Sequence, residues 1–139
     1  MNTDNLARDR DEEVVRRVLI LTGGGDAPGL NAVLRAFVKT ATDLGLEVLG
    51  SEDGFAGLIE QPGRVVPLTR KSVQGILPKG GSILGCSNRA NPFAHVERRV
   101  GGTERTVDVS ERVKAKLNEL EIDVLVLVGG DGTMDIGMR

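Results

Sequence analysis

Hydrophobic positions follow two patterns along the chain. Short, mainly apolar runs that are rich in β-branched residues predict buried strands at 14–21, 46–50 and 122–128. Apolar positions spaced three and four residues apart predict amphipathic helices at 28–44 and 109–120. Because strands alternate with helices, we predict an α/β fold, a three-layer sandwich with helices on both faces of a mostly parallel sheet.

The middle of the chain is less regular. The predicted order there is a short strand at 64–68, a short helix at 71–77, a glycine-framed strand at 80–85, a loop at 86–93 and a polar, exposed excursion at 94–108. After the strand at 122–128 comes a glycine loop, and we expect a further helix to begin near Met134. This order predicts one domain over 14–139, preceded by a polar tail at 1–13.

Composition narrows the function classes. The formal net charge is −2 and aromatic residues make up 2%, so neither a basic surface nor stacking residues indicate a nucleic-acid partner. No apolar run approaches the ~20 residues that span a bilayer, so we expect no membrane partner. The tail lacks the apolar stretch of a secretion signal, and a lone Cys86 fits a reducing compartment, so we expect a cytoplasmic protein.

Glycine is unusually frequent and is found at strand ends. The chain has 19 Gly, about twice the usual share of ~7%. Residues 22–26 (T-G-G-G-D) and 129–133 (G-G-D-G-T) each follow a predicted strand and precede a predicted helix. Glycines allow the backbone to approach phosphate oxygens, and helix N-termini favour anions. The carboxylates of Asp26 and Asp131 would repel a phosphate group. Their presence is explained if they hold a Mg²⁺ ion that in turn binds the phosphate oxygens. The alternative is that each loop is only a tight turn.

Neither standard nucleotide signature is present. The chain has no P-loop ending in Gly-Lys-Ser/Thr, and residues 23–28 do not fit the G-x-G-x-x-G register of a dinucleotide-binding fold. Instead, the segment 21–32 (L-T-G-G-G-D-A-P-G-L-N-A) closely resembles the opening motif of the 6-phosphofructokinase family. The segments 53–58, 80–85 and 129–133 continue that resemblance in the family's order. The resemblance covers nearly the whole chain, from about Val18 onward.

The resemblance implies MgATP and fructose 6-phosphate as partners and a transfer of phosphate that yields fructose 1,6-bisphosphate in glycolysis. It implies that Gly25 contacts the transferred phosphate and that Arg89 neutralises the phosphoryl group in transfer. An arginine fork suits that charge, and the alternative for Arg89, judged without the family match, is a solvated loop residue. Its loop is one residue longer than in bacterial members of the family. The nucleotide-lining residues implied by the family are Gly130, Asp131, Gly132 and Thr133, with Asp131 as the Mg²⁺ ligand.

The resemblance also implies regulation and assembly. Arg35 matches a residue that binds a regulatory ligand at a subunit interface in allosteric members, and Lys39 stands where an arginine is found. Read from the residues alone, the pair is a solvated basic face of a helix. By analogy with the family, we expect a homo-oligomer, a tetramer or dimer, for a full-length protein.

The family's catalytic base lies in a T-I-D-N-D motif that these 139 residues do not contain. We therefore expect a phosphofructokinase fragment, truncated before the sugar site and inactive alone. Two alternatives remain. One is the pyrophosphate-dependent branch of the family, which often carries an acidic residue at the position of Gly132. The other is a non-catalytic nucleotide- or phosphate-binding module, which the chain would be if it were whole.

Overall fold

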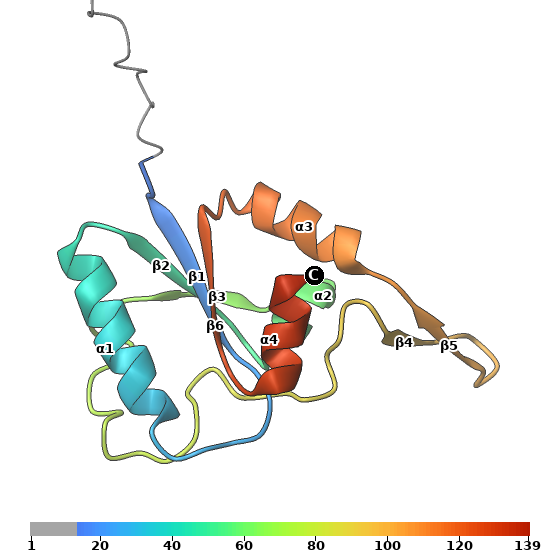
Figure 1. The fold of residues 1–139 in the computed structure, drawn as a ribbon, viewed down its shortest axis with the longest axis horizontal. Coiled ribbons are helices and arrows are strands. Elements are labelled where there is room, and N and C mark those ends of the chain that lie inside the picture. Colours follow the sequence, from blue (N-terminus) through green and yellow to red (C-terminus); the bar gives the residue numbers. More distant parts are fainter. Residues whose placement is uncertain (1–13) are drawn as a thin grey trace, which may run out of the picture.

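A central sheet organises the computed structural model, which describes residues 14–139; the tail predicted at 1–13 lies outside the described residues. The sheet has the order β3-β2-β1-β6 (Figure 1). Its strands are β1 (Arg17–Thr22), β2 (Glu47–Ser51), β3 (Val65–Leu68) and β6 (Val124–Val128). β1 pairs in parallel with both β2 and β6, and β3 pairs antiparallel with β2. The mostly parallel sheet is confirmed.

Helices cover both faces of the sheet, so the three-layer prediction is also confirmed. α1 (Leu30–Asp43) covers one face, and the other face carries α2 (Ala56–Ile59), α3 (Ser110–Glu119) and α4 (Asp131–Met138) (Figure 1). Successive side chains of a strand point to opposite faces. Ile20 of β1 therefore packs in the cluster with α1, while Leu21 packs in the cluster with α2 and α3. Residues 18–21 of β1 are all apolar, as expected for a strand whose two faces are both buried.

The two long helices begin and end close to their predicted bounds. Leu34, Val38 and Ala41 are buried on one face of α1, as the spacing predicted. Gly45 ends this helix in the left-handed region (φ 79°), which glycine adopts without steric cost. At the start of α3, the Asp108 carboxylate accepts a hydrogen bond from the Ser110 N–H at 2.8 Å. This bond lowers the pKa of Asp108 and stabilises the helix start.

Two predicted elements in the middle of the chain are wrong. Residues 71–77 form turns rather than a helix. The Thr69 and Ser72 side chains hydrogen-bond each other and the backbone there, and Gly75 takes φ 71°, so local bonds replace the helical ones. Residues 80–85 form an irregular segment rather than a strand, with left-handed backbone at Gly81 and Gly85.

The polar excursion at 94–108 is exposed as expected, but it contains two strands. β4 (His95–Arg98) and β5 (Glu104–Val107) form an antiparallel hairpin that projects from the domain (Figure 1). Glu97 ties the hairpin to α3 through Arg112, with 3.3 Å between the charged atoms. Short charged strands gave no apolar signal, so the sequence pattern missed them.

β6 was expected to be covered on both faces, and it is only half-buried. Among the described strands it lies at the edge of the sheet, paired with β1 alone. α4 begins at Asp131, before the predicted start near Met134, because the helix starts inside the glycine loop. Among residues 14–139, no helix has the length and hydropathy needed to cross a membrane.

Candidate functional site

The two glycine loops meet at the carboxyl ends of β1 and β6. The Gly23 N–H donates to the Val128 carbonyl at 2.8 Å, which joins the two loops at their roots. Thr133, in the first turn of α4, is buried between them. A Cβ at Gly129 would lie 2.5 Å from Thr133 Oγ1, and a Cβ at Gly23 would collide with the same atom. These two glycines are therefore required by packing within the protein.

A third segment, 82–88, closes against the first glycine loop. Thr22 Oγ1 donates to the Gly85 carbonyl at 2.6 Å, and the Gly24 N–H donates to the Ser87 carbonyl at 3.1 Å. The segment is also tied to α1, because Asn31 Oδ1 accepts a hydrogen bond from the Ile83 N–H at 2.8 Å. Segments far apart in the sequence thus form one polar surface at this end of the sheet.

Two cavities open at this surface, and Gly24 and Asn88 line both. The first has a volume of about 240 Å³ and is lined by Gly24, Phe55, Ser87, Asn88, Ala90, Asn91, Gly130, Gly132, Thr133 and Ile136. The second has a volume of about 460 Å³ and is lined by Gly24, Gly25, Asp26, Gly80, Gly81, Ser82, Gly85, Cys86 and Asn88. One cavity contains the predicted nucleotide-lining glycines, and the other contains the predicted phosphate contact at Gly25.

Four cavity glycines are not required by the fold. A Cβ at Gly25, Gly80, Gly130 or Gly132 would meet no atom of the described chain within 4 Å, and none of the four has a positive φ. Gly130 and Gly132 flank the start of α4, where the first N–H groups of a helix lack intrahelical acceptors. Donors of this kind, beside side-chain-free positions, are suited to phosphate oxygens.

The two loop aspartates lie at the same end of the molecule, and both are exposed. Asp131 is the first residue of α4, and Asp26 lines the larger cavity. Within residues 14–139, no three His, Cys, Asp or Glu side chains cluster as a metal cage. Mg²⁺ is commonly held by one or two carboxylates together with substrate phosphates, so this donor set fits Mg²⁺ that arrives with a nucleotide.

Arg89 lies beside the smaller cavity without lining it. Its neighbours Asn88 and Ala90 are lining residues, while Arg89 itself is exposed. Its backbone N–H is held by Ser87 Oγ at 3.2 Å. Within the described part of the chain, its guanidinium makes no hydrogen bond or ion pair. The side chain therefore has its full set of donors available for an anion in the cavity.

Comparison with known proteins identifies the family. The family model described as Phosphofructokinase matches residues 17–139. The chain belongs to the phosphofructokinase family. It is 42% identical to the ATP-dependent 6-phosphofructokinase of Chloroflexus aggregans, over 89% of this chain and 33% of that protein. It is 43% identical to the ATP-dependent 6-phosphofructokinase 2 of Clostridium perfringens, over 86% of this chain and 32% of that protein.

Solved phosphofructokinase structures agree with this family assignment. Pichia pastoris phosphofructokinase in the T-state matches with a TM-score of 0.74 and 29% identity, over 91% of this chain and 12% of that one. Phosphofructokinase from Saccharomyces cerevisiae matches with a TM-score of 0.70 and 29% identity, over 86% of this chain and 14% of that one. The chain spans about a third of the length of the curated relatives that it matches.

Several cavity residues of this phosphofructokinase chain escaped the sequence interpretation. Phe55 was part of a quoted motif, yet nothing in that motif indicated that its ring would line the smaller cavity. Ile136 could not be assigned, because the start of α4, and therefore its helical register, was placed too late. Ser87, Asn88 and Asn91 carried a detectable signal, since small polar residues in a loop after glycines often bind ligands.

Arg35 and Lys39 lie apart from the two cavities. They line a separate groove of about 370 Å³, together with Arg70, Lys71, Val73, Gln74 and Gly75. Arg70 forms an ion pair with Asp43 at the end of α1. The structure therefore adds two cations from the 69–75 turns to the two basic residues that the sequence singled out on α1.

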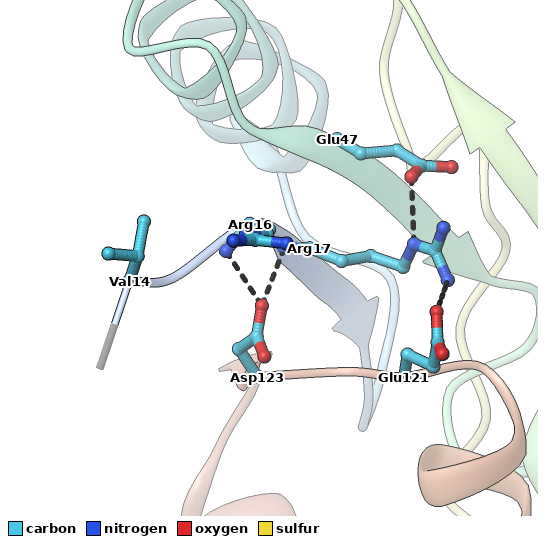
Figure 2. Close-up of a pocket in the computed structure, with 6 residues that line it drawn as sticks. All are labelled: Val14, Arg16, Arg17, Glu47, Glu121 and Asp123. Carbon is cyan, nitrogen blue, oxygen red and sulfur yellow. Dashed lines mark hydrogen bonds and ion pairs between the residues drawn. The ribbon is translucent and has the colours of Figure 1, made fainter.

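The opposite end of the sheet contains a larger hollow of about 650 Å³, and most of its charged side chains bond to one another or to the backbone (Figure 2). Arg17 Nε donates to Glu47 at 2.8 Å, and Arg17 Nη1 donates to the Leu120 carbonyl at 2.6 Å. Asp123 accepts hydrogen bonds from the backbone N–H groups of Arg17 and Arg16, which lower the pKa of its carboxyl group. This network joins strand ends and occupies Arg17, Glu47 and Asp123, while the Arg16 guanidinium makes no hydrogen bond or ion pair within residues 14–139.

Proposed function

We propose that the chain is the nucleotide-binding part of an ATP-dependent 6-phosphofructokinase. Such an enzyme transfers a phosphoryl group from MgATP to fructose 6-phosphate, forming fructose 1,6-bisphosphate in glycolysis. The observation that carries the proposal is the set of cavity glycines, Gly25, Gly130 and Gly132, whose Cβ space is empty of protein atoms. The names of the relatives support ATP as the donor.

The site residues take roles that their positions allow. Gly25 offers a side-chain-free backbone to the phosphate that is transferred, and Gly130, Gly132 and Thr133, which line the smaller cavity, contact the remainder of the nucleotide. Asp131 holds Mg²⁺ together with phosphate oxygens, and the ion neutralises negative charge on the phosphates. Arg89 turns its unpaired guanidinium toward the phosphoryl group, where a planar fork can donate to two oxygens at once.

Turnover needs groups that these residues do not supply. The 139 residues contain no T-I-D-N-D motif, which the family resemblance associates with the base for the sugar hydroxyl. A general base commonly adds about 10²–10⁴-fold to a rate, and the loss of a positioned acceptor removes several further kcal/mol of proximity. We therefore propose that the chain binds nucleotide weakly and has no kinase activity by itself. A non-catalytic nucleotide-binding module would also bind nucleotide without kinase activity, so this property does not separate the two alternatives.

The choice of donor depends on Gly132. Its empty Cβ space leaves room beside the cavity for the α-phosphate of a nucleotide, which an acidic side chain there would repel and exclude. Pyrophosphate has no such group to accommodate. The absence of a side chain at Gly132 therefore favours ATP over pyrophosphate.

Regulation and assembly form a second part of the proposal. Arg35 and Lys39 line a groove with Arg70 and Lys71, and such a cluster suits a phosphorylated regulatory ligand. A full-length protein would form a homo-oligomer, a dimer or tetramer, with this groove near a subunit interface. A cytoplasmic location follows from the glycolytic reaction and is supported by the single cysteine.

Calorimetric titration of the purified chain tests the donor. MgATP and magnesium pyrophosphate are titrated separately into wild type and into a Gly132→Asp variant. We expect wild type to bind MgATP in preference to pyrophosphate, and the variant to lose MgATP binding. A folded wild-type chain that binds neither ligand would refute the proposal, and a preference for pyrophosphate would move the protein to the other branch. A coupled assay for fructose 1,6-bisphosphate should show no turnover by the chain.

A further inference from the structure

The segment 84–88 shapes both cavities, and it is not part of a helix or strand. Ser87 and Asn88 line the smaller cavity, while Gly85, Cys86 and Asn88 line the larger one. One side of the segment is bonded to the end of β1 through Thr22 and Gly24. The contacts on the other side of the segment set the position of the cavity walls. They also set the position of Arg89, which is the next residue in the chain.

Asp53 fixes that other side. Its backbone N–H donates to the Leu84 carbonyl at 2.7 Å. Its carboxylate lies so close to Gly85 that a Cβ at Gly85 would collide with Asp53 Oδ1. Asp53 itself has φ 51°, a left-handed conformation that few residues other than glycine, asparagine and aspartate adopt readily. A side chain held in this uncommon conformation occupies the space directly beside the segment.

Arg64 holds the Asp53 carboxylate in place. Arg64 Nη1 donates to Asp53 Oδ2 at 2.7 Å. The other edge of the guanidinium is clamped by Glu60, which accepts from Nε at 2.7 Å and from Nη2 at 3.1 Å. The hydrogen bonds from Arg64 lower the pKa of Glu60, which favours the charged carboxylate that pairs with Arg64. An arginine fork bonded at both edges is a rigid support.

We propose that Asp53, braced by Arg64, is a positioning residue that sets segment 84–88 at the geometry needed to bind the nucleotide phosphates. Asp53 lines neither cavity, so it acts through the segment and not by contact with the ligand. This inference rests on the proposed nucleotide-binding function and adds a residue to which that function assigned no role. Its physical basis is that residues on a loop keep the geometry needed for binding only if surrounding contacts hold the loop in place.

The test uses two readouts on the 139-residue chain. Cys86 is the only cysteine in the sequence and lies in the segment, so the rate at which Ellman's reagent modifies it reports how well the segment is held. Calorimetry with MgATP reports the site. Asp53→Gly keeps the left-handed backbone and removes the carboxylate, while Asp53→Asn keeps the shape and an acceptor for Arg64. Glu47→Gln, which breaks an ion pair at the opposite end of the sheet, is the matched control.

We expect Asp53→Gly to raise the dissociation constant for MgATP about tenfold, the size of effect that supporting contacts around a site commonly have. Modification of Cys86 should become several-fold faster in the same variant. Asp53→Asn should restore most of both properties, and Glu47→Gln should change neither. Circular dichroism at the assay temperature establishes that each variant is folded, and Arg64→Met replaces Asp53→Gly if the latter is not.

Wild-type affinity for MgATP in a folded Asp53→Gly chain would overturn the proposal, even if the thiol reacted faster. A chain whose wild type binds no nucleotide would be a failure of the proposed function instead. In that case the thiol rate alone decides the question for Asp53. A faster rate supports its hold on the segment, and an unchanged rate overturns it.

Discussion

The two ends of the sheet are built from the same strands and have opposite character. At the amino end, Arg17 and Asp123 bond to groups from three different segments, and among the charged side chains around the hollow Arg16 is unpaired within residues 14–139 (Figure 2). At the carboxyl end, glycine loops surround two smaller cavities. The Arg89 guanidinium beside them makes no hydrogen bond or ion pair within residues 14–139. The larger hollow lies at the end where most of the charged side chains are bonded within the protein.

We infer from this contrast that the chemistry of a lining is a better guide to the candidate site than its volume. Parallel strands place all their carboxyl ends on one edge of the sheet, where the loops that follow can converge on a ligand. The amino ends are left to hold the strands together. Substitutions at the amino end should therefore act on stability. Those at the carboxyl end should act on binding where the residue faces a cavity, and on stability where it packs within the protein.

Gly25→Val should have the largest effect and should act on binding. A Cβ at this position meets no atom of the described chain within 4 Å, so we expect the fold to be retained, but the side chain occupies the space proposed for the transferred phosphate. We expect the affinity for MgATP to fall on the order of a hundredfold, comparable with the loss of one preorganised donor to an anion. Calorimetry and thermal unfolding measure the two properties. Glu47→Gln, at the opposite end of the sheet, should bind as wild type does.

Gly129→Ala should act on stability at the carboxyl end. Its Cβ would lie 2.5 Å from Thr133 Oγ1 and 3.0 Å from the Gly23 carbonyl oxygen, so the joined loops must move apart. Overpacking of this kind costs about 1–3 kcal/mol of unfolding free energy, measurable by urea denaturation. Gly130→Ala, with empty space, should leave stability unchanged. A Gly129→Ala chain as stable as wild type would show that the loops accommodate the added atom and that the steric explanation is wrong.

Arg17→Met should have a smaller effect, and one on stability alone. The variant keeps the aliphatic stem but loses the partly buried bond to the Leu120 carbonyl and the pair with Glu47. We expect a loss of about 1 kcal/mol in urea denaturation, with the affinity for MgATP unchanged. Arg16→Met should be neutral, because the bond of Arg16 to Asp123 is made by its backbone. A change in nucleotide affinity on Arg17→Met would contradict the division between the two ends.

Asp123→Asn should have the smallest effect and should depend on pH. Hydrogen bonds from the backbone N–H groups of Arg17 and Arg16 lower the pKa of Asp123 in the folded protein. A lowered folded-state pKa gives stability that is present above the unfolded pKa of about 3.9 and is lost as pH falls through the folded value. Wild type should therefore exceed Asp123→Asn in stability near pH 6, and this difference should shrink below about pH 4. A constant difference would exclude the carboxylate charge as its source.

Local sequence was sufficient to predict much of this protein. Apolar runs located β1 and β6, helical spacing located α1 and α3, and glycines marked the loops that follow β1 and β6. These features depend on residues that are neighbours in the chain. The order of four motifs was sufficient to point to the phosphofructokinase family, which comparison confirmed. The roles of Gly25, Arg89 and Asp131 remain predictions.

Only the tertiary structure decided how the loops form a site. Thr22 hydrogen-bonds to Gly85, which lies 63 positions away in the sequence. This long-range bond helps to hold residues 80–85, which were expected to form a strand, as an irregular segment that lines the cavities. Thr133 packs against both glycine loops, and the Asp53–Arg64 pair lies beside segment 84–88. The spacing of these residues along the chain gives no sign that they are neighbours in the fold. Local sequence patterns determine which backbone conformation has a low free energy. Packing and long-range hydrogen bonds decide which side chains share a surface, and those are set only when the strands assemble.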